Sequence, residues 1–274
     1  FGVERITPRQ FRDYTSARDL DREFPGARGF GLIRRVAAAD EPAFVAHART
    51  YQQNTFAIHG FAEHAGDRLV VQYIEPAERN AGGVGLDIGS ENYRRQAAEN
   101  ATLKGAAQLT APITLVQDHE HPRQSFLMLV PLYRGVATPA TLDQRIAASL
   151  GWTYVPLVIG DVLEGLDVDD QMLHLEFSDV TAGGHGIAFY AGPGVFDDSP
   201  GAVTVTLERP IYGRVWSMRF SASSAFVDSV SQASPWWILG LGTVASVLLA
   251  MLVQLLKVSR QRQRVLLSQQ ARLA

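Results

Sequence analysis

Short hydrophobic and polar stretches alternate along the chain, and one long apolar run follows them near the C-terminal end. Helices are predicted behind the capping residues Thr7, Asp40 and Ser90, and the third helix is expected to stop at Gly105. Short helices laid on antiparallel strands indicate the α+β class. Strands are predicted from apolar runs bounded by turn residues, at 29–36, 54–60, 67–76, 106–117, 123–135, 151–159, 172–180, 186–191, 202–213 and 214–223.

The polar, alanine-rich stretch at 136–150 is expected to connect two groups of elements. The first group, 1–135, ends in an antiparallel hairpin whose two strands flank the polar turn at 118–122. The second group, 136–233, is smaller and begins with the strand at 151–159. Its last helix is expected to continue directly into the apolar run.

The apolar run from Trp236 to Leu256 contains no charged residue. About 20 helical residues, each rising about 1.5 Å, cross the hydrocarbon layer of a membrane, so a transmembrane helix is predicted at 234–257. By the positive-inside rule, 1–235 are expected outside the cytoplasm and 257–274 inside it, as in an inner-membrane protein whose signalling helix starts at 258–274. This orientation follows from the residues at the two ends of the run, which are Trp236 and Trp237 before it and Lys257, Arg260, Arg262 and Arg264 after it.

Small residues recur every four positions along the predicted span, at Gly242, Ser246 and Ala250. Such a stripe lets two membrane helices approach closely, so these residues are candidate contacts of a homodimer. The alternative is that small residues are simply common in membrane spans.

Composition narrows the functional classes. The 274 residues are 46% hydrophobic and 19% charged, as in a globular chain, and the net charge of −3 gives no reason to expect nucleic-acid binding. The chain has no cysteine, which excludes disulfides, thiolate metal sites and a cysteine nucleophile. No cofactor is expected. Because the chain begins at Phe1 and not at a methionine, it is expected to be a fragment or a processed chain.

A glycine-rich segment follows the predicted strand at 67–76 and precedes the helix behind Ser90. Gly83, Gly85 and Gly89 have a spacing similar to that of a phosphate-binding loop. However, no lysine follows Gly89 and the neighbouring strands are expected to be antiparallel, which argues against a nucleotide site. The glycines are instead predicted to make a tight turn with positive φ at the rim of a ligand pocket.

The turn "DHEH" offers Asp118, His119, Glu120 and His121 as possible metal ligands. A single H-x-H pair leaves a metal site incomplete, and polar residues are expected at the exposed tip of a hairpin in any case. His119 and His121 are therefore kept as an alternative, and the prediction is that the chain has no metal site and no catalytic residue.

Several stretches of the chain together resemble the CHASE domain, an extracellular input module of receptors. The resemblance is carried by "FPGARGFGLIRRV", "YIEPAERNAGGVGLDIGSE", "GAAQLTAPITLVQ" and "FLMLVPLYR", with the patterns YxEPxxxNxxxxGxD, GxxxLTxPxxL and PxYR. It covers most of residues 1–222. It implies two PAS-like domains, a membrane-distal one that holds the ligand and a membrane-proximal one, followed by a membrane span. It also implies an N-terminal span and a stalk helix, which would precede Phe1.

The ligand-contacting positions of the family are carried over by this resemblance. Thr110 matches a threonine that lines the distal cavity, and Val116 stands where a leucine contacts the ligand through its main chain. Arg94 occupies the position of an aspartate that reads the adenine of a cytokinin, and Leu129 that of a second polar contact. With these two polar readers replaced, a small acceptor-rich or anionic ligand is expected instead of a cytokinin.

The resemblance implies the input region of a bacterial sensor that forms a homodimer and passes a signal through the membrane to an output domain beyond Ala274. Family outputs include histidine kinases of two-component systems, which are preferred here, and cyclic-di-GMP synthases. Two alternatives of other classes remain open: an anchored periplasmic enzyme with "DHEH" as its metal centre, and a docking module that binds another protein.

Overall fold

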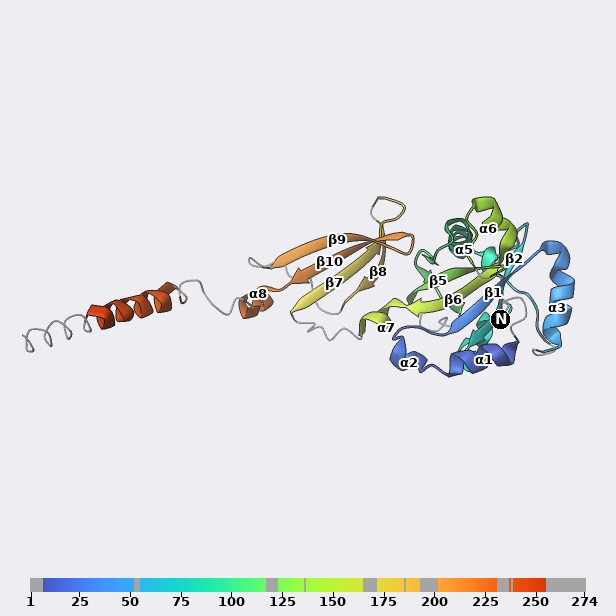
Figure 1. Ribbon diagram of the computed structural model, residues 1–274. Helices are drawn as coiled ribbons and strands as arrows, with labels where there is room; N and C mark the ends of the chain where they lie inside the picture. Colours follow the sequence, from blue (N-terminus) through green and yellow to red (C-terminus); the bar gives the residue numbers. More distant parts are fainter. Residues whose placement is uncertain are drawn as a thin grey trace, which may run out of the picture.

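The computed structural model describes residues 7–51, 55–116, 123–135, 137–164, 172–184, 186–192, 202–230, 237 and 239–254. Within them the chain forms two antiparallel sheets, a first sheet built by the N-terminal part and a second sheet beside it (Figure 1). This arrangement confirms the predicted α+β class.

The first sheet has six strands in the order β2–β1–β6–β5–β3, with β4 also paired to β5. Its strands are β1 (Phe30–Val36), β2 (Arg68–Glu75), β3 (Gln108–Leu109), β4 (Ile113–Thr114), β5 (Gln124–Tyr133) and β6 (Ser149–Val158). The antiparallel pairing of β3 and β4 with β5 confirms the predicted hairpin, whose polar turn at 118–122 lies outside the described residues. The strand predicted at 54–60 is wrong, because the described part of that segment forms only an isolated bridge at His59.

The position of β6 corrects the predicted grouping of the strands. The sequence places this strand at the start of the second group, but it pairs with β1 on one side and β5 on the other, inside the first sheet. Its side chains explain this position, since Trp152, Tyr154 and Val158 are at most 4% exposed and belong to the core of that sheet. The first sheet therefore extends to residue 158, and the segment between β5 and β6 connects two neighbouring antiparallel strands of this sheet.

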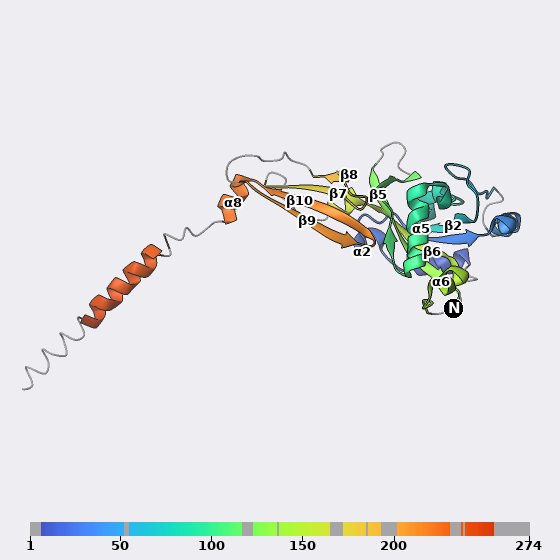
Figure 2. The same ribbon diagram turned by 90° about the horizontal axis from the view of Figure 1, so that it is seen from above.

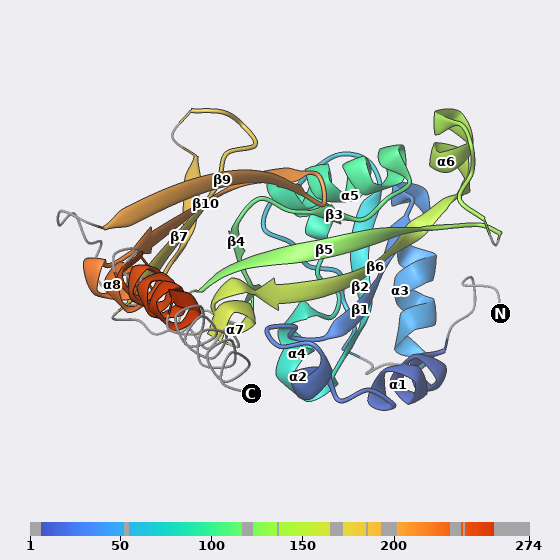
Figure 3. The same cartoon turned by 60° about the vertical axis from the view of Figure 1, so that its left-hand side comes forward.

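Helices pack on the first sheet from more than one side, as Figures 2 and 3 show. On one face, Ala97, Ala98 and Ala101 of α5 are small enough to let this helix pack closely on Trp152. Phe11 of α1 packs in a separate cluster. The helices are α1 (Pro8–Ser16), α2 (Leu20–Glu23), α3 (Glu41–Arg49), α4 (Ala77–Asn80), α5 (Asn92–Lys104), α6 (Leu142–Ala148), α7 (Ile159–Glu164) and α8 (Ser224–Val230), with the 3₁₀ turns η2 (Ala38–Asp40), η3 (Ala81–Gly83) and η4 (Ile88–Ser90).

Of the three predicted helix caps, Thr7 is confirmed, Asp40 is confirmed in position only, and Ser90 is wrong. Thr7 caps α1 through its side chain, as predicted. Asp40 occupies the N-cap position of α3, as predicted, but its side chain makes no capping hydrogen bond. The cap of α5 is Glu91 and not Ser90, because the Glu91 carboxylate accepts two backbone N–H groups of the first turn. The end of α5 is as predicted, since Gly105 adopts a left-handed φ of +65°.

The glycine-rich segment extends the first sheet beyond β2. Gly85 donates its N–H to the carbonyl of Val71, and the carbonyl of Leu86 accepts the N–H of Val71, both at 2.9 Å. On its other side, the segment bonds to His59, whose N–H donates to Gly85 and whose carbonyl accepts from Asp87 at 3.1 and 2.7 Å. The segment thereby covers a strand edge that would otherwise be free to pair with another chain.

Positive φ is confined to one of the three spaced glycines. Gly85 has a φ of +84°, whereas Gly83 and Gly89 do not adopt the left-handed conformation, so the predicted turn geometry is confirmed at one position. A Cβ atom at Gly85 would lie 2.3 Å from the carbonyl oxygen of Ala57. Glycine is required there by both the backbone angle and the close approach of another backbone segment.

We expect Gly85→Ala to lower the free energy of unfolding by at least about 1–2 kcal/mol, the usual cost of a left-handed conformation for a residue with a Cβ. The matched control is Gly82→Ala, because a Cβ at Gly82 meets no atom within 4 Å and needs no positive φ. Urea unfolding followed by circular dichroism measures both. Equal effects of the two substitutions would contradict the assigned role of Gly85.

The second sheet has four strands in the order β8–β7–β10–β9. All of its pairings are antiparallel, and four of the predicted strands are confirmed in it. The short helix α8 follows β10 at the end of the sheet remote from α3 (Figure 1). The strands are β7 (Leu173–Asp179), β8 (Ile187–Ala191), β9 (Val203–Ile211) and β10 (Arg214–Ala222).

An aromatic cluster joins the two sheets. Phe126 on β5 is 1% exposed, and its ring centroid lies 5.0 Å from that of Phe189 on β8 and 5.1 Å from that of Trp216 on β10. The neighbouring Leu127 and Leu129 belong to the core under α5 instead, because successive residues of a strand face opposite sides of the sheet. β5 therefore contributes side chains to the core under α5 and to the core of the second sheet.

Residues 239–254 are helical, and every one of them is exposed. Among the described residues, no helix is long and apolar enough to cross a membrane. The remaining positions of the predicted span, except Trp237, lie outside the described residues, as do 258–274.

Candidate functional site

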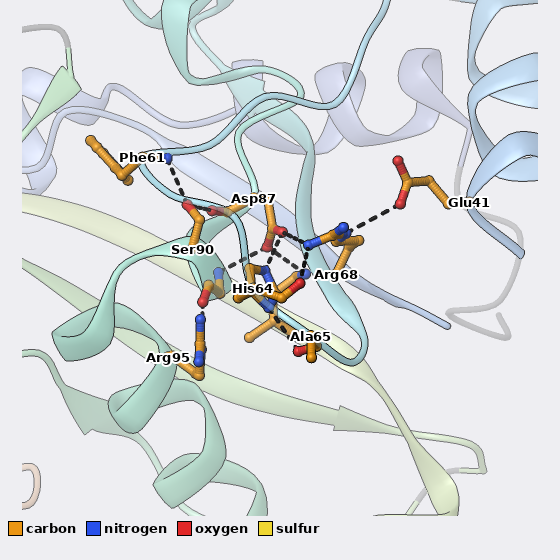
Figure 4. A network of polar contacts seen from close by, with 10 residues as sticks. Glu41, Phe61, His64, Ala65, Arg68, Asp87, Ser90 and Arg95 are labelled. Carbon is orange, nitrogen blue, oxygen red and sulfur yellow. Dashed lines mark hydrogen bonds and ion pairs between the residues drawn. The ribbon is translucent and has the colours of Figure 1, made fainter. Parts of the chain in front are cut away.

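A buried carboxylate, Asp87, organises the end of the glycine-rich segment. Its Oδ1 atom accepts the backbone N–H groups of Leu69 and Gly89, each at 2.9 Å. Its Oδ2 atom lies 2.6 Å from Nε2 of His64 and 3.7 Å from Nη1 of Arg68. The Asp87 side chain is 4% exposed, so these four partners replace the water that an ionised carboxylate would otherwise bind. Figure 4 shows the network around it.

Both ring nitrogens of His64 face oxygen atoms. Nδ1 lies 3.0 Å from the carbonyl oxygen of Ala65, and Nε2 lies against the carboxylate of Asp87. The His64 ring therefore links the loop before β2 to the side chain of Asp87.

Two further side chains extend the network to neighbouring elements. Arg68 donates through Nε to Glu41 on α3 at 3.2 Å and through Nη1 to the carbonyl of His64 at 3.0 Å. Ser90 donates its hydroxyl to the carbonyl of Asp87 at 2.6 Å and accepts the N–H of Phe61 at 2.9 Å. The network thus ties α3, the loop before β2 and the start of α5 to one buried charge (Figure 4).

Two cavities flank this network. The loop cavity, about 460 Å³, includes Glu41, His59, Phe61, Arg68, Asp87 and Ser90 in its lining. The α5 cavity, about 450 Å³, includes Arg35, His64, Asp67, Arg95, Glu99 and Trp152. Both volumes fall within the range of small-molecule sites, about 300–1,000 Å³.

Arg94, predicted to read the ligand, is buried and already paired. It is 4% exposed, and its guanidinium donates to Glu91 at 3.2 Å and to the carbonyl of Thr114 at 2.8 Å. Its guanidinium carbon lies 4.7 Å from the ring centroid of Phe61, within cation–π range. Burial lowers the pKa of Arg94, while the charge of Glu91 opposes that shift, and the guanidinium stays protonated.

The other three predicted ligand residues lie in or against the core beside α5. Thr110 is fully buried, and its hydroxyl accepts the N–H of Leu127 at 3.0 Å. Leu129 is also fully buried, and Val116 packs against the same cluster of apolar side chains. The structure thus brings the four residues into the region of α5, β3, β4 and β5, but none of the four lines either cavity beside Asp87.

The remaining candidates are not brought into any site that the structure describes. His119 and His121 lie outside the described residues. Gly242, Ser246 and Ala250 lie on the exposed helical segment 239–254, where the Ser246 hydroxyl donates to the carbonyl of Gly242 at 2.8 Å. Their proposed contact with a second chain stays a prediction.

A sequence model of the CHASE domain matches residues 4–190. The chain belongs to the CHASE domain family. This family consists of sensory input modules, so the chain is an extracytoplasmic sensory domain, and the resemblance inferred from its sequence patterns is confirmed.

Two solved structures are similar to this CHASE domain at low sequence identity. An extracellular ligand binding receptor from Desulfohalobium retbaense is 9% identical, with a TM-score of 0.40 over 72% of this chain and 30% of that chain. The periplasmic sensory domain of the Campylobacter jejuni chemoreceptor Tlp1 is 10% identical, with a TM-score of 0.45 over 82% of this chain and 81% of that chain. No curated protein matches the chain.

The structure gives a physical role to three residues of the CHASE pattern YxEPxxxNxxxxGxD. Asn80 is 1% exposed, and its side-chain amide donates to the carbonyls of Arg28 and Pro76, both at 2.9 Å. Gly85 provides the left-handed turn, and Asp87 is the centre of the polar network. The CHASE pattern therefore includes Asp87, although the sequence alone does not predict that Asp87 belongs to a site.

No comparable sequence pattern indicates that His64 and Arg68 belong to this site. They precede Asp87 by 23 and 19 positions, and their pairing with it depends on the antiparallel approach of β2 to the glycine-rich segment.

Proposed function

We propose that this chain is the input region of a transmembrane receptor. A small ligand binds in the part built on the first sheet, and the second sheet passes the resulting change to a membrane helix. The observation that carries this proposal is the CHASE match over 4–190, which takes in the whole first sheet and reaches β8 of the second.

The two sheets are proposed to be the two PAS-like parts of the receptor. The antiparallel order β2–β1–β6–β5–β3, with α5 packed on one face, supports this assignment for the membrane-distal part, which includes β6 and so reaches residue 158. The second sheet, with α8 leading toward the C-terminal end, is proposed as the membrane-proximal part. The shared aromatic cluster around Phe126 supports mechanical coupling between them.

A membrane helix at 234–257 completes the proposed receptor. The uncharged run from Trp236 to Leu256 supports it, as do the large apolar side chains of 239–254 that no described part of the chain covers. We further propose that this helix forms a homodimer through Gly242, Ser246 and Ala250. The output beyond it is proposed to be a histidine kinase, with a cyclic-di-GMP synthase as the alternative.

The ligand of this receptor is proposed to be small and anionic or rich in acceptors. Arg94 supports this, because a carboxylate or phosphate could replace Glu91 as the partner of its guanidinium, and bidentate pairing favours such groups. Thr110, Val116 and Leu129 would surround the rest of the ligand. Opening the space requires α5 to move away from β5, and that movement is what the second sheet would sense.

Thermal-shift measurements on the full chain in lipid nanodiscs test this function. A library of small organic acids and phosphates is expected to contain compounds that raise Tm, since ligand at 100 times its Kd stabilises the folded state by about 2.7 kcal/mol. Arg94→Gln should abolish the shift, whereas Arg22→Gln on the exposed helix α2 should not. Sub-micromolar binding of the cytokinin isopentenyladenine, or the absence of any stabilising compound, would contradict the proposal.

A further inference from the structure

The α5 cavity lies apart from Arg94 and has its own chemical character. It is bounded by α5, by α6, by β1, β2 and β6 of the first sheet and by the loop before β2. Arg94 and Arg95 are neighbours on α5, yet Arg94 is buried in the core and Arg95 is half-buried in the cavity wall. Any ligand held by Arg95 therefore occupies a different place from one held by Arg94.

One side of the cavity is apolar. Trp152 is 3% exposed and its indole N–H already donates to the carbonyl of Ala98 at 2.8 Å, so the ring offers only an apolar surface. Leu103 on α5 and Ile146 on α6 line the same space and remain 40% and 42% exposed. Exposed apolar side chains around an aromatic ring are suited to cover an apolar group of a ligand.

Some polar groups of the cavity are satisfied within the chain. Arg35 donates through Nε to the carboxylate of Asp67 at 2.6 Å, and Thr102 donates its hydroxyl to the carbonyl of Ala98 at 3.2 Å. His64 is held by Asp87. These groups leave little unused hydrogen-bonding capacity for a ligand.

Arg95 and Glu99 are the exception. Arg95 uses its Nε to donate to the carbonyl of Gly89, but within the described part of the chain neither its two terminal nitrogens nor the Glu99 carboxylate has a partner. The two residues stand one helical turn apart, and such positions are neighbours on a helix surface, about 5–6 Å apart at Cβ. The cavity therefore presents one free positive and one free negative group beside an apolar wall.

We propose that the α5 cavity binds a free amino acid with an apolar side chain. Its α-carboxylate pairs with the terminal nitrogens of Arg95, its α-ammonium group pairs with Glu99, and its side chain packs against Trp152, Leu103 and Ile146. Guanidinium pairs bidentately with carboxylates, and a carboxylate is the natural partner of an ammonium group. The balance of charge excludes a simple anion or cation as the best ligand, since either would leave one charged group of the cavity without a partner.

Binding at this site would reach the Asp87 network directly. Arg95 donates to the carbonyl of Gly89, and the N–H of Gly89 donates to the Asp87 carboxylate. A ligand that draws the Arg95 guanidinium into the cavity thereby acts on the glycine-rich segment at the edge of the first sheet. The site is independent of the proposed Arg94 ligand and could be occupied together with it.

Calorimetric titration of the full chain in nanodiscs with L-phenylalanine and three analogues tests the ligand class. L-phenylalanine is expected to bind, while phenethylamine, which lacks the carboxylate, 3-phenylpropanoate, which lacks the ammonium group, and glycine, which lacks the side chain, each bind at least tenfold more weakly. No binding of L-phenylalanine, or equal binding of any analogue, would overturn the proposal.

Two substitutions test the residue assignment. Arg95→Gln should weaken L-phenylalanine binding at least tenfold and leave the weak binding of phenethylamine unchanged, whereas Glu99→Gln should weaken L-phenylalanine equally and spare 3-phenylpropanoate. The control is Arg9→Gln, whose side chain is 92% exposed on α1 and should have no effect. If either cavity variant binds L-phenylalanine with unchanged affinity, the proposed amino-acid site is wrong. The receptor function is tested separately, and it is still supported if Arg94→Gln abolishes the thermal shift caused by small acids or phosphates. The analogue titrations on the unmodified chain decide the matter if a variant does not fold.

Discussion

Asp87→Ala is expected to lower the free energy of unfolding by about 3–5 kcal/mol, the cost of removing one partner from a buried ion pair. The substitution removes the partner of the His64 ring, which is 8% exposed, and one of the two carboxylates that face the Arg68 guanidinium. It also removes the acceptor of the Leu69 and Gly89 backbone N–H groups, which are held at the edge of the first sheet. Urea unfolding of the full chain, followed by circular dichroism, measures the loss.

Two further variants separate charge from hydrogen bonding at this position. Asp87→Asn keeps an acceptor for the two backbone N–H groups but lacks the negative charge, so an intermediate loss is expected. Asp21→Asn removes a carboxylate that is 64% exposed and paired with Arg79 on the surface, and no measurable change is expected there. If Asp87→Ala destabilises the protein no more than Asp21→Asn, the Asp87 network is not the centre of this region.

Phe126→Ala is expected to cost about 3–5 kcal/mol, the usual loss for removing a buried phenylalanine side chain. Its larger consequence is loss of coupling, because its ring joins β5 of the first sheet to Phe189 and Trp216 of the second. Hydrogen–deuterium exchange should therefore accelerate in β7–β10 more than in the core under α5. The variant should also lose any ligand-dependent change in the second sheet.

Phe24→Ala is the matched control for this substitution. Phe24 is 41% exposed, and its ring meets that of Phe30 on β1. Neither ring belongs to the aromatic cluster that joins the two sheets. Its loss should leave the exchange of β7–β10 unchanged. Exchange that rises uniformly in both sheets of Phe126→Ala would show that this cluster contributes stability but does not couple the sheets.

Local residue patterns predicted most of the strands and some of the positions where helices begin or end. The hairpin of β3 and β4 with β5, the four strands of the second sheet, the Thr7 cap and the Gly105 stop follow from residue pattern and turn chemistry. The segment at 54–60 has a strand-like pattern, but the only β-pairing of its described residues is the isolated bridge at His59. Strand-like composition is not sufficient when the chain offers no partner of matching length.

The place of β6 could not be read from spacing along the chain. The polar interval at 136–150 looks like a domain boundary, yet the first sheet needs the strand that follows it to fill the gap between β1 and β5. Long-range pairing decides such cases, because a strand pairs where its two faces can be buried. Trp152 on the α5 side and Leu157 in the cluster with the second sheet show that both faces of β6 are covered.

The candidate site was predictable only in part. The family pattern located Arg94 and Thr110, but it did not reveal that Glu91, three residues earlier on the same helix surface, pairs with Arg94. The Asp87 network joins residues from the loop before β2, from β2 itself and from the glycine-rich segment, so its geometry exists only in the folded chain. Residue type and spacing do not predict a site assembled by sheet pairing.

Hydrogen–deuterium exchange of the full chain in nanodiscs, with and without a compound selected by thermal shift, tests the central claim most directly. If ligand binding in the first part is transmitted, protection will change both around α5 and in β10 and α8 of the second part. Phe126→Ala should retain the first change and lose the second. Protection that changes around α5 alone, with β7–β10 and α8 unaffected, would contradict the proposed transmission.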